Sequence, residues 1–166
     1  MKKLKILLCD PRHSTIGSHV TSIPIGIGYI ASYIKKKIKN VKLERILEID
    51  PDKILFEIVN FKPDILASSN YVWNSQISNF ICSEAKKHNP NTLCVLGGPE
   101  FPAGTGARKI ENTDFDKTYD KCFEFLINRP CVDYFSYTDG EVSMIEIIER
   151  FIEKNFLVKE LKSTDL

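Results

Sequence analysis

The stretch that decides the fold is KPDILASSNYVWNSQISNFICSEAKKHNPNTLCVLGG, residues 62–98. It opens on a short apolar run, 64–68, which is typical of a buried strand. Four apolar residues then recur at the spacing of one helix face: Ile77, Phe80, Ile81 and Ala85. Asn89-Pro90-Asn91 ends that helix, and a second apolar run covers 93–96. A strand, a helix and a strand of this length predict a parallel βαβ unit.

The rest of the chain repeats this alternation. Further strands are expected at 4–9, 41–49 and 132–137, and further helices at about 24–38, 50–60, 119–128 and around 145–152. Apolar strands that alternate with helices favour a parallel sheet covered on both faces. The sequence therefore predicts an α/β fold, a flavodoxin-like (Rossmann-like), doubly wound, five-stranded parallel sheet in a three-layer α/β/α arrangement.

Composition limits the possible partners. The 166 residues are 43% hydrophobic and 27% charged, with a formal net charge of +1. This balance argues against a dedicated nucleic-acid binder, and no apolar run approaches the ~20 residues that a membrane span needs. The five cysteines are scattered and form no CxxC pair, so we expect reduced thiols in a cytoplasmic protein.

Two long polar loops point to one functional edge. They cover about 10–23 and 97–117, and both follow strands, so they lie at the carboxyl ends of the predicted sheet. Ligands of open α/β sheets bind at this edge, and loops of this length in compact domains are usually functional or disordered.

The loop after the third strand carries small and aromatic residues: Ser68, Ser69, Tyr71, Val72, Trp73 and Asn74. Hydroxyl groups permit a ligand to approach the sheet edge, and large aromatic rings can wall a pocket. An alternative interpretation, compatible with the first, is that Trp73 anchors the following helix.

Glycines mark the ends of the two later strands. Gly97, Gly98, Pro99 and Glu100 follow the fourth strand, and Gly140 and Glu141 follow the fifth. Glycine permits a close approach that a Cβ would prevent. The alternatives are a plain tight turn at 97–100, which would not by itself require the long polar stretch that follows, and a turn with a helix N-cap at 138–141.

Other motifs are weaker. Residues 26–31 match GxGxxA, but they lie inside a helical pattern and not in a tight turn after the first strand, as a dinucleotide fingerprint requires. A response-regulator receiver needs an acceptor aspartate after the third strand, where this chain has serines. His13 lies in the first long loop, where it is a candidate metal ligand or a solvated side chain.

Six segments follow one another along the chain and are considered together. They are the first strand, SIPIGIGYIA (22–31), KPDI (62–65), YVWN (71–74), LGGPE (96–100) and VDY…DGE (132–141). In this order they resemble the N-terminal cobalamin (B12)-binding domain of the B12-dependent radical SAM proteins. The resemblance covers nearly all of residues 3–155. It implies cobalamin as the ligand, with the corrin ring across the carboxyl edge of the sheet and the nucleotide tail between the loops of the third and fourth strands.

The resemblance also implies the residues around the ligand. Ser68, Ser69, Tyr71, Val72, Trp73 and Asn74 would line one side, Gly97, Gly98, Pro99 and Glu100 the other, and Gly140 and Glu141 the far rim.

Two departures from related patterns matter. Better-known cobalamin domains carry DxHxxG after the first strand, whereas Asp10, His13 and Gly17 stand at a different spacing, so His13 is a secondary candidate for a cobalt axial ligand. The CxxxCxxC signature of a [4Fe–4S] cluster is absent, so S-adenosylmethionine and the cluster would belong to a radical SAM domain in cis, downstream. We expect a cobalamin-binding-like domain over 1–158, a tail or linker over 159–166, and no catalysis by this chain alone.

Two other functions stay open. One is a degenerate flavodoxin-like interaction or scaffold domain without a cofactor. The other is a binder of a small nucleotide or a flavin at the same edge, which is distinguished by the chromophore that co-purifies.

Overall fold

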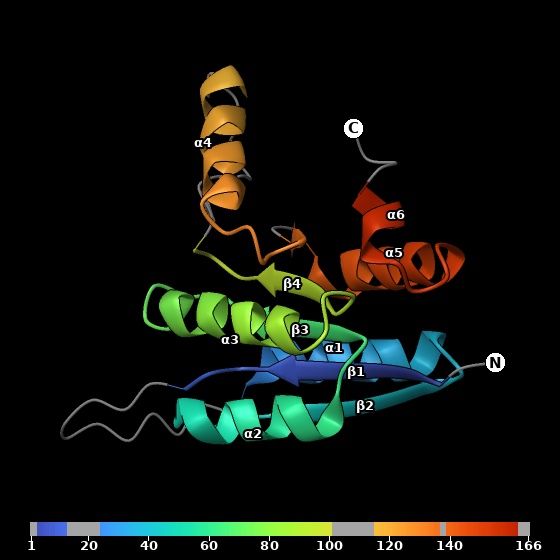
Figure 1. Cartoon of the computed structure of the whole chain (residues 1–166). Helices are drawn as coiled ribbons and strands as arrows, with labels where there is room; N and C mark the ends of the chain where they lie inside the picture. Colours follow the sequence, from blue (N-terminus) through green and yellow to red (C-terminus); the bar gives the residue numbers. More distant parts are fainter. Residues whose placement is uncertain (1–2, 13–23, 101–114, 137–138, 163–166) are drawn as a thin grey trace.

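Five parallel strands form the centre of the protein, in the order β2-β1-β3-β4-β5. The computed structural model describes residues 3–12, 24–100, 115–136 and 139–162 (Figure 1). The strands are β1 (Leu4–Cys9), β2 (Val41–Ile46), β3 (Ile65–Ser69), β4 (Leu93–Gly97) and β5 (Tyr134–Ser136). The helices are α1 (Ile25–Lys37), α2 (Pro51–Phe61), α3 (Ser75–His88), α4 (Phe115–Ile127), α5 (Gly140–Glu153) and α6 (Val158–Lys162). This order is the flavodoxin-like one and confirms the predicted fold class.

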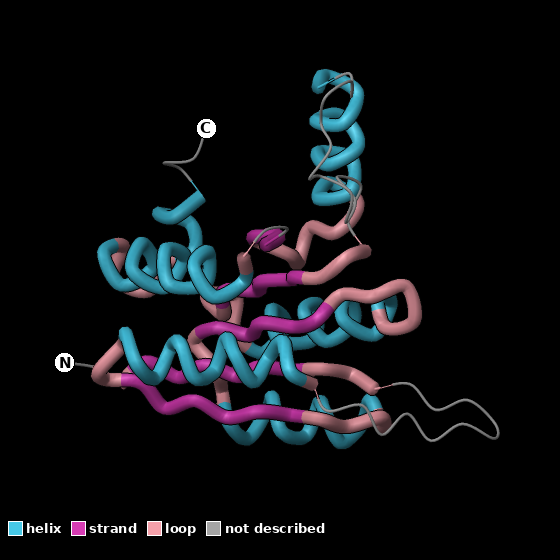
Figure 2. The backbone as a smooth tube through the Cα atoms, turned by 180° about the vertical axis from the view of Figure 1, so that it is seen from behind, coloured by secondary structure: helices cyan, strands magenta, loops and turns pink. Residues whose placement is uncertain are grey.

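Alternating side chains of the strands build two cores. Leu4, Ile6 and Leu8 of β1 pack under α1 and α5, whereas Leu7 and Cys9 pack under α2 and α3. The two pairs of helices cover opposite faces of the sheet, as Figure 2 shows from behind. This is the expected three-layer arrangement, and it follows from the period of two in a strand.

Helix α4 departs from this layering, because it extends away from the sheet (Figure 1). Its last turn reaches the core through Leu126, which packs against the cluster beneath α2 and α3. The rings of Phe125 and Phe135 meet edge to face with centroids 5.5 Å apart. Phe123 and Ile127 are exposed.

The buried face of α3 differs from the expected one. Phe80 is 44% exposed, and the buried residues are Ser78, Ile81, Cys82 and Ala85. Ser78 can be buried because its hydroxyl donates a hydrogen bond to the carbonyl oxygen of Ser69 at 2.7 Å. A pattern of apolar residues does not reveal a serine whose hydrogen bond is supplied by another element.

Several helix and strand boundaries also differ from the predicted ones. Pro24 is the N-cap of α1 and not a residue of its first turn, and β5 is shorter than expected. The short helix α6 was not predicted. Its Val158 and Leu161 are buried in the core beneath α1 and α5, so ordered structure continues past the expected linker start at residue 159.

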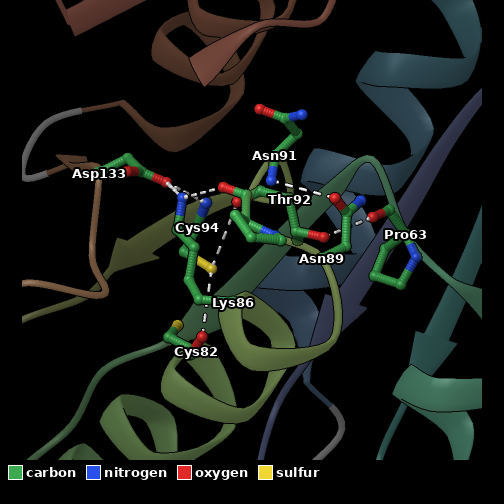
Figure 3. A network of polar contacts seen from close by, with 9 residues as sticks. Pro63, Cys82, Lys86, Asn89, Asn91, Thr92, Cys94 and Asp133 are labelled. Carbon is green, nitrogen blue, oxygen red and sulfur yellow. Dashed lines mark hydrogen bonds and ion pairs between the residues drawn. The ribbon is translucent and has the colours of Figure 1, made fainter. Parts of the chain in front are cut away.

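Two aspartates hold the amino-terminal edge of the sheet in register. The backbone N–H of Asp64 donates to the Lys5 carbonyl, and its carboxylate accepts the Lys5 N–H, both at 2.9 Å. Asp133 makes the same pair of bonds with Cys94, at 2.8 and 2.7 Å, and its carboxylate also lies 2.6 Å from the Lys86 ammonium (Figure 3). These two motif residues therefore have structural roles far from the carboxyl edge.

None of the helices in the described part of the chain is long and apolar enough to cross a membrane.

Candidate functional site

A cavity of about 680 Å³ lies at the carboxyl ends of β1, β3 and β4, between the first turns of α1 and α5. Strand β1 has β2 on one side and β3 on the other, so the chain reverses its winding direction here. Such a switch point is where open α/β sheets bind ligands, and the volume falls in the range of small-molecule pockets.

Small residues form the floor of the cavity. Ala67 and Ser69 of β3 and Val95 and Gly97 of β4 lie on the sheet face that α1 and α5 cover, and all four line the cavity. A Cβ on Gly97 would lie 3.3 Å from the Ser136 carbonyl oxygen, so the end of β4 is also close to β5. Larger side chains at these positions would fill the space between the sheet and the helices.

Ser68 lies on the other face of the sheet. It is 4% exposed, and its hydroxyl bonds to that of Ser78 at 3.2 Å, so only its main chain can border the cavity. The side chain of Leu96 packs in the same direction. The strand alternation that places Ser69 on the cavity floor thus turns Ser68 toward α3.

A network of polar contacts joins the loops after β1 and β3. The Ser69 hydroxyl donates to Asp10, and the Asn74 amide donates to the Ser69 hydroxyl and to the Pro11 carbonyl at 3.0 and 3.1 Å. The Asn74 side-chain oxygen accepts the Tyr71 N–H at 2.7 Å. Asn74 is 1% exposed and is not among the lining residues, so it fixes the wall from behind.

An aromatic pair stands at the rim. The rings of Tyr71 and Trp73 are stacked, with centroids 4.6 Å apart and an interplanar angle of 5°. Both line the cavity, and Trp73 is 55% exposed. That exposure argues against Trp73 as a buried anchor of α3. Val72, between them, is 73% exposed and is not among the lining residues.

The slot expected between the loops of β3 and β4 is closed. Asn70 donates its backbone N–H to Gly97 O and its amide to Glu100 O, both at 2.7 Å, and accepts the Glu100 N–H at 3.1 Å. Gly98 has φ +137°, and a Cβ there would lie 2.5 Å from the Asn70 oxygen. Glycine is required at 98 because the chain approaches itself. These contacts leave no space directly between Asn70 and Gly98 for the nucleotide tail that was expected there.

The helix side of the cavity comes from α1 and α5. Gly140 and Glu141 border it at the first turn of α5, as Gly26 and Ile30 do on α1. A Cβ on Gly140 would lie 3.2 Å from the Ile30 side chain, so a glycine here brings the two helices together. Asp139 is the N-cap residue of α5, as expected, although no side-chain capping bond forms.

The structure thus brings most of the predicted site residues to one place. Lining residues are Ser68 through its main chain, and Ser69, Tyr71, Trp73, Gly97, Gly98, Gly140 and Glu141. The predicted residues Val72, Asn74, Pro99 and Glu100 are not lining residues, and His13 lies outside the described residues, with most of both long loops. Sequence reasoning missed Gly26 and Ile30, although their i, i+4 spacing gave a signal.

No group of three or more His, Cys, Asp or Glu residues in the described ranges has a geometry that would hold a metal ion directly. The buried residues Cys9 and Cys82 are neutral thiols. Burial, with a smaller effect of Asp10, raises the pKa of Cys9 to about 12, and a hydrogen bond with Cys94 together with burial raises the pKa of Cys82. Neutral, buried thiols are poor metal ligands.

A second, open groove of about 820 Å³ lies beside β2 and α2. Its lining is mainly charged and includes Lys42, Glu44 and Asp52 with the ring of Phe56. The groove is outside the carboxyl edge of the central strands, so the 680 Å³ cavity is the candidate ligand site.

Comparison with known protein families finds no match. Two curated proteins are similar over about half of this chain. One is the cobalamin-dependent radical SAM methyltransferase TokK of Streptomyces tokunonensis, with 31% identity over 87 residues, 52% of this chain and 10% of that protein. The other is 2-(S-pantetheinyl)-carbapenam-3-carboxylate methyltransferase of Streptantibioticus cattleyicolor, with 30% identity over 92 residues, 55% of this chain and 11% of that protein. The match thus spans about a tenth of the length of these relatives.

Two solved structures with a similar fold are receiver domains. A signal receiver domain of an HD domain-containing protein from Pseudomonas fluorescens has a TM-score of 0.55, 12% identity and coverage of 98% of this chain and 99% of that chain. A CheY-like receiver domain from Methanospirillum hungatei has a TM-score of 0.54, 10% identity and coverage of 93% and 98%. This likeness concerns the fold alone. A receiver needs an acceptor aspartate at the end of its third strand, whereas β3 of this chain ends in Ser68 and Ser69.

Proposed function

We propose that this chain is a cobalamin-binding module that serves a radical SAM domain in the same, longer protein. The cavity between α1 and α5 is the observation that carries the proposal, because it lies beside the segments that resemble B12-binding domains. The similarity to two cobalamin-dependent or methyl-transferring enzymes supports the same ligand class. The chain would hold a cofactor and would not turn over a substrate by itself.

The residues of the cavity fit a nucleotide tail. Its floor of Ala67, Ser69, Val95 and Gly97 leaves room next to the sheet and offers one hydroxyl. The first turns of α1 and α5 both border the space, and helix N-termini favour an anion such as the phosphate of a tail. We place the tail here, on the α1/α5 side of the sheet, instead of between the loops of β3 and β4.

The rim fits a large apolar ring. The stacked, exposed pair of Tyr71 and Trp73 offers a flat surface beside the mouth of the cavity, suited to contact with a corrin. Gly140 and Glu141 would close the opposite rim, and Ser68, Asn74 and Gly98 would shape the walls through their internal contacts. A bound cobalamin would supply methyl-transfer or related radical chemistry to the rest of the protein, with S-adenosylmethionine and an iron–sulfur cluster held by the radical SAM domain.

Hydroxocobalamin tests this proposal directly. The 166-residue chain at about 50 µM should co-elute with the red chromophore in gel filtration and shift its visible spectrum. Flavin mononucleotide, applied in parallel, should elute separately. Elution of the folded chain without cobalamin would contradict the proposal, and retention of the flavin instead would support the small-nucleotide alternative.

A further inference from the structure

Strand β2 is the outer strand of the sheet, and no described residue pairs with its outer edge. Lys42, Glu44 and Arg45 are exposed. An outer strand of six residues presents a row of backbone donors and acceptors that another strand can use.

The contacts with β1 show which residues face outward. Asn40 and Ile46 direct their carbonyls toward β1, where they accept the N–H groups of Leu4 and Asp10, each at 3.0 Å. Backbone groups alternate in direction along a strand, so the even-numbered residues face β1 and the odd-numbered residues face outward. Val41, Leu43 and Arg45 therefore carry backbone donors and acceptors that no other described residue of the chain binds.

Charges select one antiparallel register. Outward residues must oppose outward residues, so a symmetric pair of β2 strands can centre on residue 42, 43 or 44 within the middle of the strand. Centring on 42 or 44 places Lys42 against Lys42 or Glu44 against Glu44. Centring on Leu43 instead places each Lys42 opposite the Glu44 of the other copy.

We propose that a second copy of this chain binds along β2, antiparallel and centred on Leu43, to form one continuous sheet. About six backbone hydrogen bonds would join Val41, Leu43 and Arg45 of the two copies. Lys42 and Glu44 occupy positions without backbone bonds between the strands, where opposed side chains are closest.

The side chains lie where this pairing needs them. The Lys42 ammonium is 5.0 Å from the Phe61 ring centroid, on the α2 face, and Glu44 lines the same groove beside α2. Both charges of a pair would thus meet on one face of the joined sheet, beside exposed Phe56. Leu43 packs on the opposite face, beneath α1.

A second copy is favoured over an unrelated strand because the sequence Lys42-Leu43-Glu44 is its own antiparallel complement. Charged side chains on an edge strand usually discourage pairing. Here Lys42 and Glu44 disfavour the registers centred on residues 42 and 44 and permit the register centred on Leu43. The cavity between α1 and α5 is on another part of the molecule, so the inference is independent of cobalamin binding.

Sedimentation equilibrium of the 166-residue chain tests the pairing. The wild type is expected to dimerise reversibly, and more weakly as salt rises. Lys42→Glu and Glu44→Lys should each weaken dimerisation by about tenfold or more, since each change makes two symmetric contacts repulsive. The double variant Lys42→Glu/Glu44→Lys restores opposite charges and should return the dissociation constant to within about threefold of the wild type.

A backbone variant tests the hydrogen bonds. Arg45→Pro removes an outward N–H and leaves the ladder with β1 intact, so it should weaken dimerisation more than its control, Arg45→Ala. A wild type that stays monomeric up to about 500 µM would overturn the proposal. So would single charge reversals without effect, or a double variant that does not recover while its circular dichroism remains native.

Discussion

Replacing Gly26 with phenylalanine is expected to close the cavity without harming the fold. Gly26 borders the cavity from the first turn of α1, and an added Cβ would have no heavy atom within 4 Å. Ile30, one turn later on the same face, also borders the cavity, so the new ring would point into it. The substitution adds bulk where we place the tail of cobalamin.

The two effects differ in sign and size. Removing a glycine from a helix should stabilise the fold by about 0.5 kcal/mol, because the unfolded chain loses freedom and phenylalanine has the better helix propensity. Ligand binding should weaken by at least about 1.4 kcal/mol, a tenfold rise in the dissociation constant, since overfilled sites cost about 1–3 kcal/mol.

Gly28→Phe is the matched control. Gly28 is in the same helix, a Cβ there also meets nothing within 4 Å, and the residue is not among those that line the cavity. Titration of both variants with hydroxocobalamin, followed by visible absorbance, should show weakened binding for Gly26→Phe alone. Urea denaturation should show both variants at least as stable as the wild type.

Equal cobalamin affinity of the two variants would refute the proposed tail position. Loss of binding in both variants, with native circular dichroism, would show that α1 as a whole and not the cavity controls the ligand.

Two further predictions concern stability. Lys86→Met leaves the fully buried Asp133 carboxylate without its lysine and should lower the free energy of unfolding by about 3 kcal/mol, whereas Lys87→Met, at the exposed pair with Glu84, should change it by about 0.5 kcal/mol or less. Equal urea midpoints for the two variants would contradict this. Burial raises the pKa of Cys9 from an ordinary 9.0 to about 12, so the unfolded chain loses this proton first, and Cys9 should contribute a fall in stability of about 1.4 kcal/mol per pH unit between about pH 9 and pH 12. Cys9→Ala should reduce the slope of stability against pH in this range by that amount, and an unchanged slope would exclude a contribution from Cys9.

The position of small and aromatic residues directly after strand ends predicted most of the site. The errors arose from contacts between segments that are distant in the sequence. Strand endings and loop chemistry identified the β3 and β4 segments, and eight of the residues named there and on α5 border the cavity. The same reasoning placed the tail beside Gly98, where the backbone of Asn70 fills the space instead. A glycine signals a close approach, but the sequence does not say which atoms approach.

The aspartates of residues 64 and 133 give a second example. Both belong to segments that carry the resemblance to B12-binding domains. Each nevertheless binds the backbone of a neighbouring strand at the edge of the sheet opposite the cavity. A carboxylate next to a strand can bind a ligand or the backbone of the sheet. Only the position of the adjacent strand distinguishes these two roles.

The sequence by itself determined the order of strands and helices and the doubly wound class of fold, because hydrophobic periodicity and chain connectivity are local properties. The tertiary structure decided which face of each strand meets which helices, where the open space remains, and which strand edge is free. Those features depend on the packing of segments distant in the chain, and a shift of one residue in a strand exchanges the buried and the open face.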